Sequence, residues 1–472
     1  MRFTFKAGLS AATLVLLSAC GGSSSSDGNT NPPPSSQVCS KQNLHEFWYD
    51  TLGYEYLWLD ELETPSQAFS EYQDTNRMLD DVLPSRDVFS FMVPTDAWNA
   101  TIEGESFGFG IDYGPVGDEL LIYQVYKNSP AEAAGMKRGD IITEINDLPA
   151  SSVISMLLRG DYDAFYELLG PDEIGVEVEF SWRRPTTSST YSQPIAKDDI
   201  QINTVAHYSV KSTNAGKIAY LAFPTGFFEN SAQEIDAAFV YFKSQQPDHF
   251  ILDLRDNGGG FLSVAARLSL YLAGDKLADK TFLRITHNQN LAQWNQSYSV
   301  RDLIDEASGV SYSRILANSL DLNEVVVLTN DGTASASESV INGLLPYMEV
   351  TTIGQSTYGK PVGFYANDGS YDINGEETQF NTCNETLLAL NFQTENARGE
   401  ADYVNGFSAD CYVSSDTPVA DWGELKDPAQ VRALAYVQDN NCSGSLAAKP
   451  FSAPVKGKIQ KTIALPGMIL NK

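Results

Sequence analysis

The sequence predicts a multi-domain α/β protein. Between about residues 206 and 437, apolar strand-like runs alternate with helix-like segments, which favours a layer of parallel strands. The run 325–328 is apolar and β-branched, and a helix-like segment that contains Val340 and Leu344 follows it. The length of 472 residues is enough for about two to four domains, each with a substantial core.

Residues 1–19 have the features of a targeting segment. Arg2 and Lys6 form a short basic region, and residues 11–17 form an apolar run that is too short to span a membrane. The segment ends in Leu-Ser-Ala-Cys20, which resembles the lipobox of bacterial lipoproteins. The resemblance implies that Cys20 becomes the lipidated first residue of an exported protein; the alternative is an ordinary cleaved signal peptide.

Export implies an oxidising compartment, in which cysteines form disulfide bonds. The remaining cysteines are Cys39, Cys383, Cys411 and Cys442, and four cysteines permit three pairings. We expect Cys383 to pair with Cys411, because the two flank one polar segment. Cys39 and Cys442 would then join the two ends of the folded part.

Composition restricts the possible partners and cofactors. The net charge of −30 argues against nucleic acid or anionic lipid as a binding partner, because either would be repelled. We expect no metal site and no cofactor, since the chain has four histidines, no H-E-x-x-H motif and no paired C-x-x-C motif.

Three segments outside the α/β region carry little chemical signal. Residues 20–38 are rich in glycine, serine, asparagine and proline, which predicts a disordered tether. Residues 39–101 have aromatic side chains clustered at helical spacing, which predicts a small helical domain. Residues 438–472 form a C-terminal tail with five lysines and no acid after Cys442.

Residues 102–185 contain a glycine-spaced turn and a short helix with clear ends. Pro130 lies in the first turn of that helix, and Gly135 ends it. The pattern Ser-Pro-Ala-x-x-Ala-Gly-x-x-x-Gly-Asp-x-Ile, which begins at Ser129, resembles a PDZ domain. The resemblance implies that an extended peptide binds by strand addition and that a loop captures its terminal carboxylate. That loop would consist of Phe107, Gly108, Phe109, Gly110 and Ile111; the alternative is a PDZ-like spacer without a ligand.

Two glycine-rich breaks follow predicted strands of the α/β region, at residues 253–260 and 330–335. Sites in such sheets form beyond the carboxyl ends of the strands, so the two breaks could face one another. Glycines after a buried strand expose N–H groups that suit an oxyanion, or they simply form a tight turn. Arg255 and Asp256 are expected to form a structural ion pair.

Ser335 lies where a strand turns into a helix, beside N–H groups that have no intrahelical partner. These conditions suit a nucleophile, although Ser335 and Glu338 also have the spacing of a capping box, which needs no chemistry. None of the histidines (His45, His207, His249 and His287) lies in a glycine-bounded turn. Lys360 follows such a turn and becomes a base if burial disfavours its ammonium form by roughly 4–5 kcal/mol, whereas a loop lysine is usually a solvated charge.

Together these motifs resemble the C-terminal processing (tail-specific) proteases of peptidase family S41. The resemblance rests on Ala334-Ser-Ala-Ser-Glu338, on Thr357-Tyr-Gly-Lys360, on the break at 253–260 and on the preceding PDZ domain. It implies a crotonase/ClpP-like α/β core over residues 206–437. The implied roles are Ser335 as nucleophile, Lys360 as general base, Glu338 as orienting group, and the N–H of Ala336 and of Gly259 or Gly260 as oxyanion hole.

The sequence departs from the family pattern at two positions near the dyad. Some members carry an acidic residue eleven positions after the serine, where this chain has Pro346. Pro361 follows Lys360, where glycine is common. The first departure removes any third member at that position.

The resemblance implies an exported serine endopeptidase that cleaves polypeptides near their C-termini and is lipid-anchored in the cell envelope. Gly21 after Cys20 suits the periplasmic side of an outer membrane if the cell is Gram-negative. A competing interpretation is a non-catalytic PDZ-containing binding protein or chaperone on a peptidase-like core. A crotonase-like acyl-CoA enzyme would explain neither the PDZ domain nor the export signal.

Overall fold

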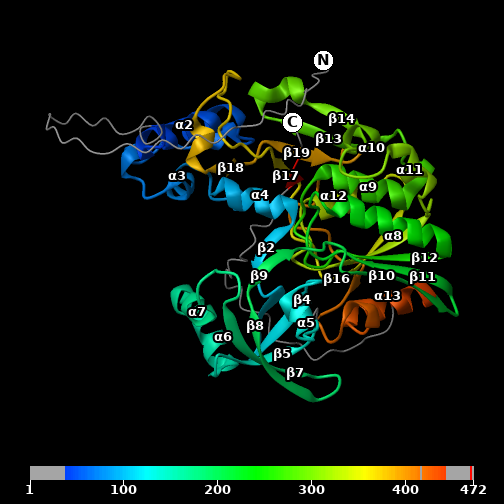
Figure 1. Cartoon of the computed structure of the whole chain (residues 1–472). Coiled ribbons are helices and arrows are strands. Elements are labelled where there is room, and N and C mark those ends of the chain that lie inside the picture. The colour runs from blue at the N-terminus through cyan, green and yellow to red at the C-terminus, as the bar shows by residue number, and fades with distance from the viewer. Residues whose placement is uncertain (1–37, 415–416, 443–467, 470–472) are drawn as a thin grey trace, which may run out of the picture.

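The computed structural model describes residues 38–414, 417–442 and 468–469. The predicted signal peptide, Cys20, nearly all of the predicted tether and most of the C-terminal tail lie outside these residues. No helix within the described ranges is long and apolar enough to cross a membrane. The described chain forms a helical N-terminal segment, a PDZ-like sheet with its helices, and a larger α/β core (Figure 1).

The N-terminal segment packs directly against the core. Ser40 caps its first helix and Asp74 caps the next, because each side chain accepts a hydrogen bond from a backbone N–H three residues later. Trp48 and Tyr56 are buried in one apolar cluster with Leu387 of the core. The elements are α2 (Lys41–Glu55), η1 (Leu59–Glu61), η2 (Phe69–Glu71), α3 (Thr75–Val82), β1 (Phe91–Val93) and α4 (Thr95–Glu103). The clustered aromatic residues are therefore core residues, and β1 pairs with β18 (Thr386–Leu388).

The PDZ-like part is an antiparallel sheet in the order β3-β4-β5-β7-β8. Its short helix α5 begins as the sequence predicts, with the Ser129 side chain accepting from the N–H of Glu132 and Pro130 in the first turn. The strands are β3 (Ile111–Val116), β4 (Glu119–Val125), β5 (Ile141–Ile145), β6 (Leu148–Pro149), β7 (Glu177–Arg184) and β8 (Ser189–Ala196), and the helices are α5 (Pro130–Ala133), α6 (Ala150–Arg159) and α7 (Tyr162–Leu169). A two-stranded ribbon, β2 (Glu105–Gly108) with β9 (Asp198–Gln201), joins this part to the core (Figure 1).

The core sheet has the order β10-β11-β12-β15-β16-β20. Its strands from β11 to β20 are parallel, which confirms the prediction, and β10 is antiparallel to β11. Alternate residues of β11 face opposite sides: Leu221 packs in the cluster that contains α8, α9 and α12, and Tyr220 packs in the cluster that contains α13. The bounds are β10 (His207–Thr213), β11 (Gly216–Ala222), α8 (Ser231–Gln245), β12 (His249–Asp253), α9 (Leu262–Ala273), β15 (Glu324–Thr329), α12 (Ala336–Leu344), β16 (Glu349–Gly354), β20 (Cys411–Tyr412) and α13 (Pro428–Asp439).

A second sheet, in the order β14-β13-β19-β17-β21, lies beyond the layer that contains α9 and α12 (Figure 1). Its strand β17 begins two residues after Lys360, so this sheet positions the lysine. The bounds are β13 (Thr281–His287), β14 (Gln296–Ser299), β17 (Val362–Phe364), β19 (Phe392–Glu395) and β21 (Met468–Ile469), with the short helices η3 (Gly274–Lys276), η4 (Gln289–Trp294), α10 (Val300–Leu303), α11 (Tyr312–Ala317), η5 (Phe380–Cys383) and η6 (Trp422–Glu424).

Both predicted disulfide pairings are wrong. Cys39 pairs with Cys383, and Cys411 pairs with Cys442. The reason for the first bond is that the helix η5 packs on α2, where the ring of Phe380 stacks on that of Phe47 with centroids 4.1 Å apart. The second bond joins the edge strand β20 to the chain that leaves α13, because both pack on the same face of the core sheet.

Buried charges hold the PDZ-like part to the core. The guanidinium of Arg138 lies 2.7 Å from the Asp427 carboxylate, which in turn lies 3.2 Å from Arg255. Arg255 also pairs with Asp253 at 2.7 Å. The expected partner of Arg255, Asp256, instead accepts a hydrogen bond from the Asn330 amide at 3.1 Å. The prediction of an Arg255–Asp256 pair was therefore wrong, because Arg255 turns back along its own strand toward the domain interface.

Candidate active site

Ser335 lies at a sharp turn between β15 and α12. Its backbone angles are φ 61° and ψ −113°, in the positive-φ region that residues other than glycine occupy at a cost of about 1–3 kcal/mol. The turn is fixed by the neighbouring glycine-rich loop: the Thr333 hydroxyl donates to the Leu254 carbonyl at 2.8 Å, and the Ala334 N–H donates to the Asn257 carbonyl at 3.0 Å. The two glycine-rich breaks therefore do face one another, and the turn places Ser335 between them.

The Ser335 hydroxyl is buried, and apart from its capping contact with the backbone at the start of α12 it has no hydrogen-bond partner among the described residues. Buried polar groups nearly always have a partner, so a hydroxyl without a side-chain partner at a strained turn indicates a functional position. No histidine contacts this hydroxyl in the described structure, and no hydrogen bond joins it to Lys360.

Two backbone N–H groups beside Ser335 have no partner in the described hydrogen bonds: those of Ala336 and Gly260. The Gly259 N–H, by contrast, donates to the Asn257 side-chain oxygen at 3.0 Å. A Cβ on Gly259 would lie 2.8 Å from the Cβ of Ser335, so only glycine permits the loop to approach so closely. Of the predicted oxyanion donors, the structure thus leaves the N–H groups of Ala336 and Gly260 available, and Gly259 makes the close contact with Ser335.

Lys360 lies in the turn between β16 and β17, and its side chain is buried between two aromatic rings. Its Nζ atom is 5.3 Å from the ring centroid of Phe364, in β17, and 5.1 Å from that of Phe89, in the N-terminal segment. Burial lowers the pKa of Lys360 to about 8, although the charges of Asp87 and Glu338 oppose this shift. At pH 7 about one lysine in ten is then neutral, compared with about one in 2,500 for an exposed lysine.

Glu338 joins the backbones of the serine and lysine turns. One carboxylate oxygen, Oε2, accepts from the N–H of Ser335 at 2.9 Å and from the N–H of Lys360 at 2.8 Å. The other oxygen, Oε1, accepts from the Thr357 hydroxyl at 2.6 Å and from the Gly359 N–H at 2.8 Å. Because the two N–H groups share one acceptor, the nitrogens of Ser335 and Lys360 are at most 5.7 Å apart, the sum of the two bonds.

The Glu338 side chain is fully buried, and burial raises its pKa while the four donors oppose that rise. Its contacts are to backbone and hydroxyl groups, and none of its hydrogen bonds reaches the Lys360 amine or the Ser335 hydroxyl. The Glu338 carboxylate therefore holds the serine and lysine turns together.

Two residues near Lys360 were missed by the sequence analysis: Asp87 and Phe89. Both belong to the N-terminal segment, which showed no chemical signal in its sequence. The ring of Phe89 also packs edge-on against that of Tyr358, with centroids 6.0 Å apart. No local pattern identifies these residues, because their contact with Lys360 depends on how the N-terminal segment packs against the core.

The predicted peptide-binding residues of the PDZ-like part lie around β2 and β3. Phe107 and Gly108 belong to β2, and Ile111 begins β3, which is an edge strand of its sheet. Phe109 is buried in the PDZ core, where its ring packs edge-on against Phe180. Gly110 has φ +79°, and a Cβ there would lie 2.1 Å from the Cβ of Ser129. The loop thus has the glycine geometry and the open strand edge that peptide addition requires.

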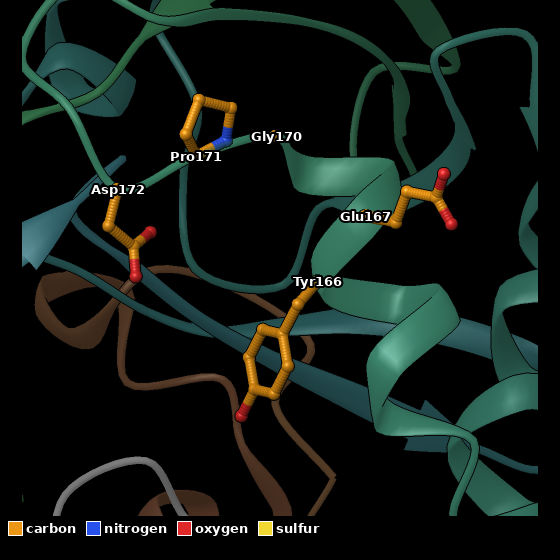
Figure 2. A pocket seen from close by; sticks show the side chains of 5 residues that line it. All are labelled: Tyr166, Glu167, Gly170, Pro171 and Asp172. Carbon is orange, nitrogen blue, oxygen red and sulfur yellow. The ribbon is translucent and has the colours of Figure 1, made fainter.

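A shallow depression at the far end of the PDZ-like part has no connection with Ser335. It is lined by Tyr166, Glu167, Gly170, Pro171 and Asp172 (Figure 2). The side chains of Glu167 and Asp172 lie on opposite sides of it, and Asp172 is paired with Lys197 at 2.7 Å. The helix α7 beside it lies at the left edge of the PDZ-like part in Figure 1. Nor does any group of acidic, histidine or cysteine side chains within the described residues have the arrangement of a metal site.

Two parts of the chain are similar to known families. Residues 217–365 match the model of peptidase family S41, and residues 121–161 match a PDZ domain model. The carboxy-terminal processing protease CtpA of Bacillus subtilis is 28% identical over 264 residues, which cover 56% of this chain and 49% of that protein. The carboxyl-terminal-processing protease of a Picosynechococcus species is 25% identical over 303 residues, covering 63% and 64%.

The chain thus spans about half to two thirds of the length of these curated relatives. The crystal structure of a putative S41 protease from Bacteroides fragilis shares the fold, with a TM-score of 0.62 and 22% identity over 84% of this chain and 97% of that one. The region that matches the peptidase model, residues 217–365, includes both glycine-rich breaks, Ser335 and Lys360. The chain therefore contains a peptidase family S41 domain joined to a PDZ domain.

Proposed function

We propose that this protein is an exported serine endopeptidase that acts through a dyad of Ser335 and Lys360. The observation that carries the proposal is the joint placement of a buried serine hydroxyl without a side-chain partner and a buried lysine with a pKa of about 8. A single carboxylate, that of Glu338, fixes the backbones of both residues. Such an arrangement activates a hydroxyl without a histidine.

In the proposed reaction, the neutral Lys360 amine removes the hydroxyl proton of Ser335 as its oxygen attacks the scissile carbonyl carbon. The N–H groups of Ala336 and Gly260 donate to the resulting oxyanion. The C–N bond then breaks, and the Lys360 ammonium gives its proton to the leaving amine. Water attacks the acyl-enzyme and gives a proton to Lys360, which returns it to the Ser335 oxygen as the ester bond breaks.

The reaction requires that the site open, because the Ser335 hydroxyl is closed off from solvent. Ser335 is fully buried and makes no hydrogen bond to Lys360, so a peptide reaches the hydroxyl only after a neighbouring segment moves. Residues around the site that carry large exposed apolar side chains are Tyr358 and Val404. The backbone at Gly359 packs against that of Val404. Any movement of the 357–360 turn that admits substrate therefore also involves the 404–406 turn.

The second part of the proposal concerns how the substrate arrives. The PDZ domain binds the C-terminal end of a polypeptide along β3, with its terminal carboxylate at residues 107–111. The support for this is the open edge of β3, the positive φ angles of Gly108 and Gly110, and the names of the relatives, which describe processing at the carboxyl terminus. Lipidation of Cys20 then holds the enzyme at a bacterial membrane, on the periplasmic side of the outer membrane in a Gram-negative cell.

Peptide cleavage tests this proposal. A polypeptide with a free C-terminal carboxylate and the same polypeptide with a C-terminal amide are incubated with the protein, and the products are identified by mass spectrometry. We expect Ser335→Ala and Lys360→Ala to abolish cleavage and the amide to be cut more slowly. The control variants Ser313→Ala and Lys280→Ala change exposed residues and should cleave normally. Binding of the peptide without cleavage by the unchanged protein would support the competing binding or chaperone function.

A further inference from the structure

The pocket around Lys360 is formed by two separate parts of the chain. Phe364 belongs to the same strand region as the lysine, but Phe89 comes from the loop between α3 and β1. The Nζ atom lies at similar distances, 5.1 and 5.3 Å, from the two ring centroids. A cation at such a distance from the face of an aromatic ring is stabilised by the ring, by about 0.5–2 kcal/mol. The N-terminal segment therefore contributes one wall of the base's pocket.

Asp87 fixes the loop that carries Phe89. Its Oδ1 atom accepts from the N–H groups of Phe89 and Ser90, both at 2.9 Å. Its Oδ2 atom accepts from the hydroxyls of Tyr56, at 2.7 Å, and Ser90, at 2.6 Å. The Ser90 hydroxyl also accepts from the N–H of Leu390, which ties the loop to the core. Four donors hold the carboxylate in one orientation, so Asp87 sets both the shape of the loop and the position of a negative charge.

The charged and titratable groups around Lys360 are few. Glu338 faces it from α12, and Asp87 faces it from the N-terminal loop; both carboxylates favour the ammonium form, with Asp87 the stronger of the two. Tyr358, in the lysine's own turn, and the buried Tyr403 near Glu338 remain neutral, because burial raises the pKa of each. Arg86, beside Asp87, is directed away, since it pairs with Glu61 and stacks over Trp58.

We propose that Asp87 and Phe89 are positioning residues for the general base: they complete the pocket of Lys360 with an anionic charge and an aromatic face from the N-terminal segment. The inference rests on the proposed function, because it assumes that Lys360 is the base. It also gives this chain an acidic partner for the dyad, although Pro346 stands eleven positions after Ser335, where some members of the family carry an acid.

The test compares the pH dependence of Ser335 acylation in matched variants of the full chain. The rate of labelling by a fluorophosphonate probe is measured from pH 6 to pH 10 in the unchanged protein, Asp87→Asn, Asp87→Glu and Asp81→Asn. Asp81 is a suitable control, because it also accepts from a tyrosine hydroxyl, a serine hydroxyl and a backbone N–H in the same segment, but its charge is not among those that act on Lys360. A Ser335→Ala variant establishes that the labelling reports on this serine.

The expected result has a defined direction. Acylation needs neutral Lys360, so its rate rises with pH through a midpoint of about 8. Removing the charge of Asp87 makes the ammonium less favourable, which moves this midpoint to lower pH by about 0.5–1 unit. The labelling rate at pH 6.5 should therefore rise about 3- to 8-fold. Asp87→Glu should restore the midpoint, and Asp81→Asn should leave it in place.

A second variant covers the case in which Asp87→Asn does not fold. Phe89→Leu keeps an apolar side chain but removes the ring face from the ammonium, so its midpoint should also move to lower pH. Midpoints in Asp87→Asn or Phe89→Leu that equal those of the unchanged protein and of Asp81→Asn would overturn the inference and leave the dyad intact. Absence of Ser335-dependent labelling in the unchanged protein would instead refute the proposed function.

Discussion

At the scale of single residues, the conformation of Ser335 is the clearest sign of function. Its φ of 61° and ψ of −113° are easily adopted by glycine and unfavourable for serine. The surrounding contacts, from Thr333 to Leu254 and from Ala334 to Asn257, hold the turn despite this cost. The strained backbone of Ser335 therefore lowers the stability of the fold at the residue that carries the hydroxyl.

This account predicts that glycine stabilises the protein at position 335. Ser335→Gly relieves about 1–3 kcal/mol of backbone strain and loses about 0.5–1 kcal/mol through the greater freedom of the unfolded chain. Ser335→Gly should therefore be more stable than Ser335→Ala by about 1 kcal/mol, and both should be inactive. Urea unfolding of the two variants measures the difference. A glycine variant that is less stable than the alanine variant would show that the turn is not strained.

Burial of Lys360 also predicts how stability changes with pH. The ordinary pKa of 10.5 applies to the unfolded chain, and the folded value is about 8. Below pH 8 both states are protonated, and the folded state carries a penalty of about 3 kcal/mol. Between these values the unfolded chain binds more protons, so this penalty disappears as the pH rises.

The unbranched, uncharged variant Lys360→Met should therefore be more stable than the unchanged protein at pH 7, by up to about 3 kcal/mol. The gain should shrink at pH 9.5, because the folded lysine has by then lost its proton. Urea unfolding at both pH values provides the comparison. An equal gain in stability at pH 7 and pH 9.5 would mean that folding does not lower the pKa of Lys360.

At the scale of secondary-structure elements, the carboxylate of Glu338 fixes the start of α12 to the turn before β17. The prediction of a strand, a glycine-rich break and a helix around Ser335 was confirmed, because each follows from local sequence preferences. The sequence also indicated the capping relation of Ser335 and Glu338. It did not indicate that Glu338 accepts from Thr357, Gly359 and Lys360, since those bonds depend on how two distant turns meet.

Glu338→Gln tests this connection. The amide has the same shape, but its NH2 group faces N–H donors, so at least one donor loses its acceptor at a cost of about 1–3 kcal/mol. We expect lower stability and a strong loss of peptide cleavage, measured on the same preparation. The matched change Glu349→Gln, at an exposed position in β16, should alter neither. Full activity in Glu338→Gln would show that the two turns align without the carboxylate.

At the scale of the whole molecule, the N-terminal segment packs as part of the α/β core. The sequence of residues 39–101 predicts a helical domain without chemical signal. In the structure, Trp48 and Tyr56 share an apolar cluster with Leu387, and the loop with Asp87 and Phe89 borders Lys360. The same long-range packing explains why the disulfide prediction failed, because spacing along the chain says nothing about η5 lying on α2.

The disulfide between Cys39 and Cys383 fastens this segment to the core. A bond that closes so long a loop should stabilise the folded state by about 2–4 kcal/mol. The double variant Cys39→Ser, Cys383→Ser should therefore have a lower unfolding midpoint than the unchanged protein. Reducing agent should change the midpoint of this variant little, because the variant no longer contains the bond. A non-reducing peptide map showing Cys39 joined to Cys442 would contradict the structure.

The central claim is that Lys360 activates Ser335, and site mapping of a serine-reactive probe tests it most directly. The unchanged protein, Ser335→Ala and Lys360→Ala are treated with a fluorophosphonate at pH 8, digested and analysed by mass spectrometry. The account predicts an adduct on Ser335 in the unchanged protein and none in either variant. An adduct on Ser335 that forms at the same rate in Lys360→Ala, or an adduct on a different serine, would contradict it.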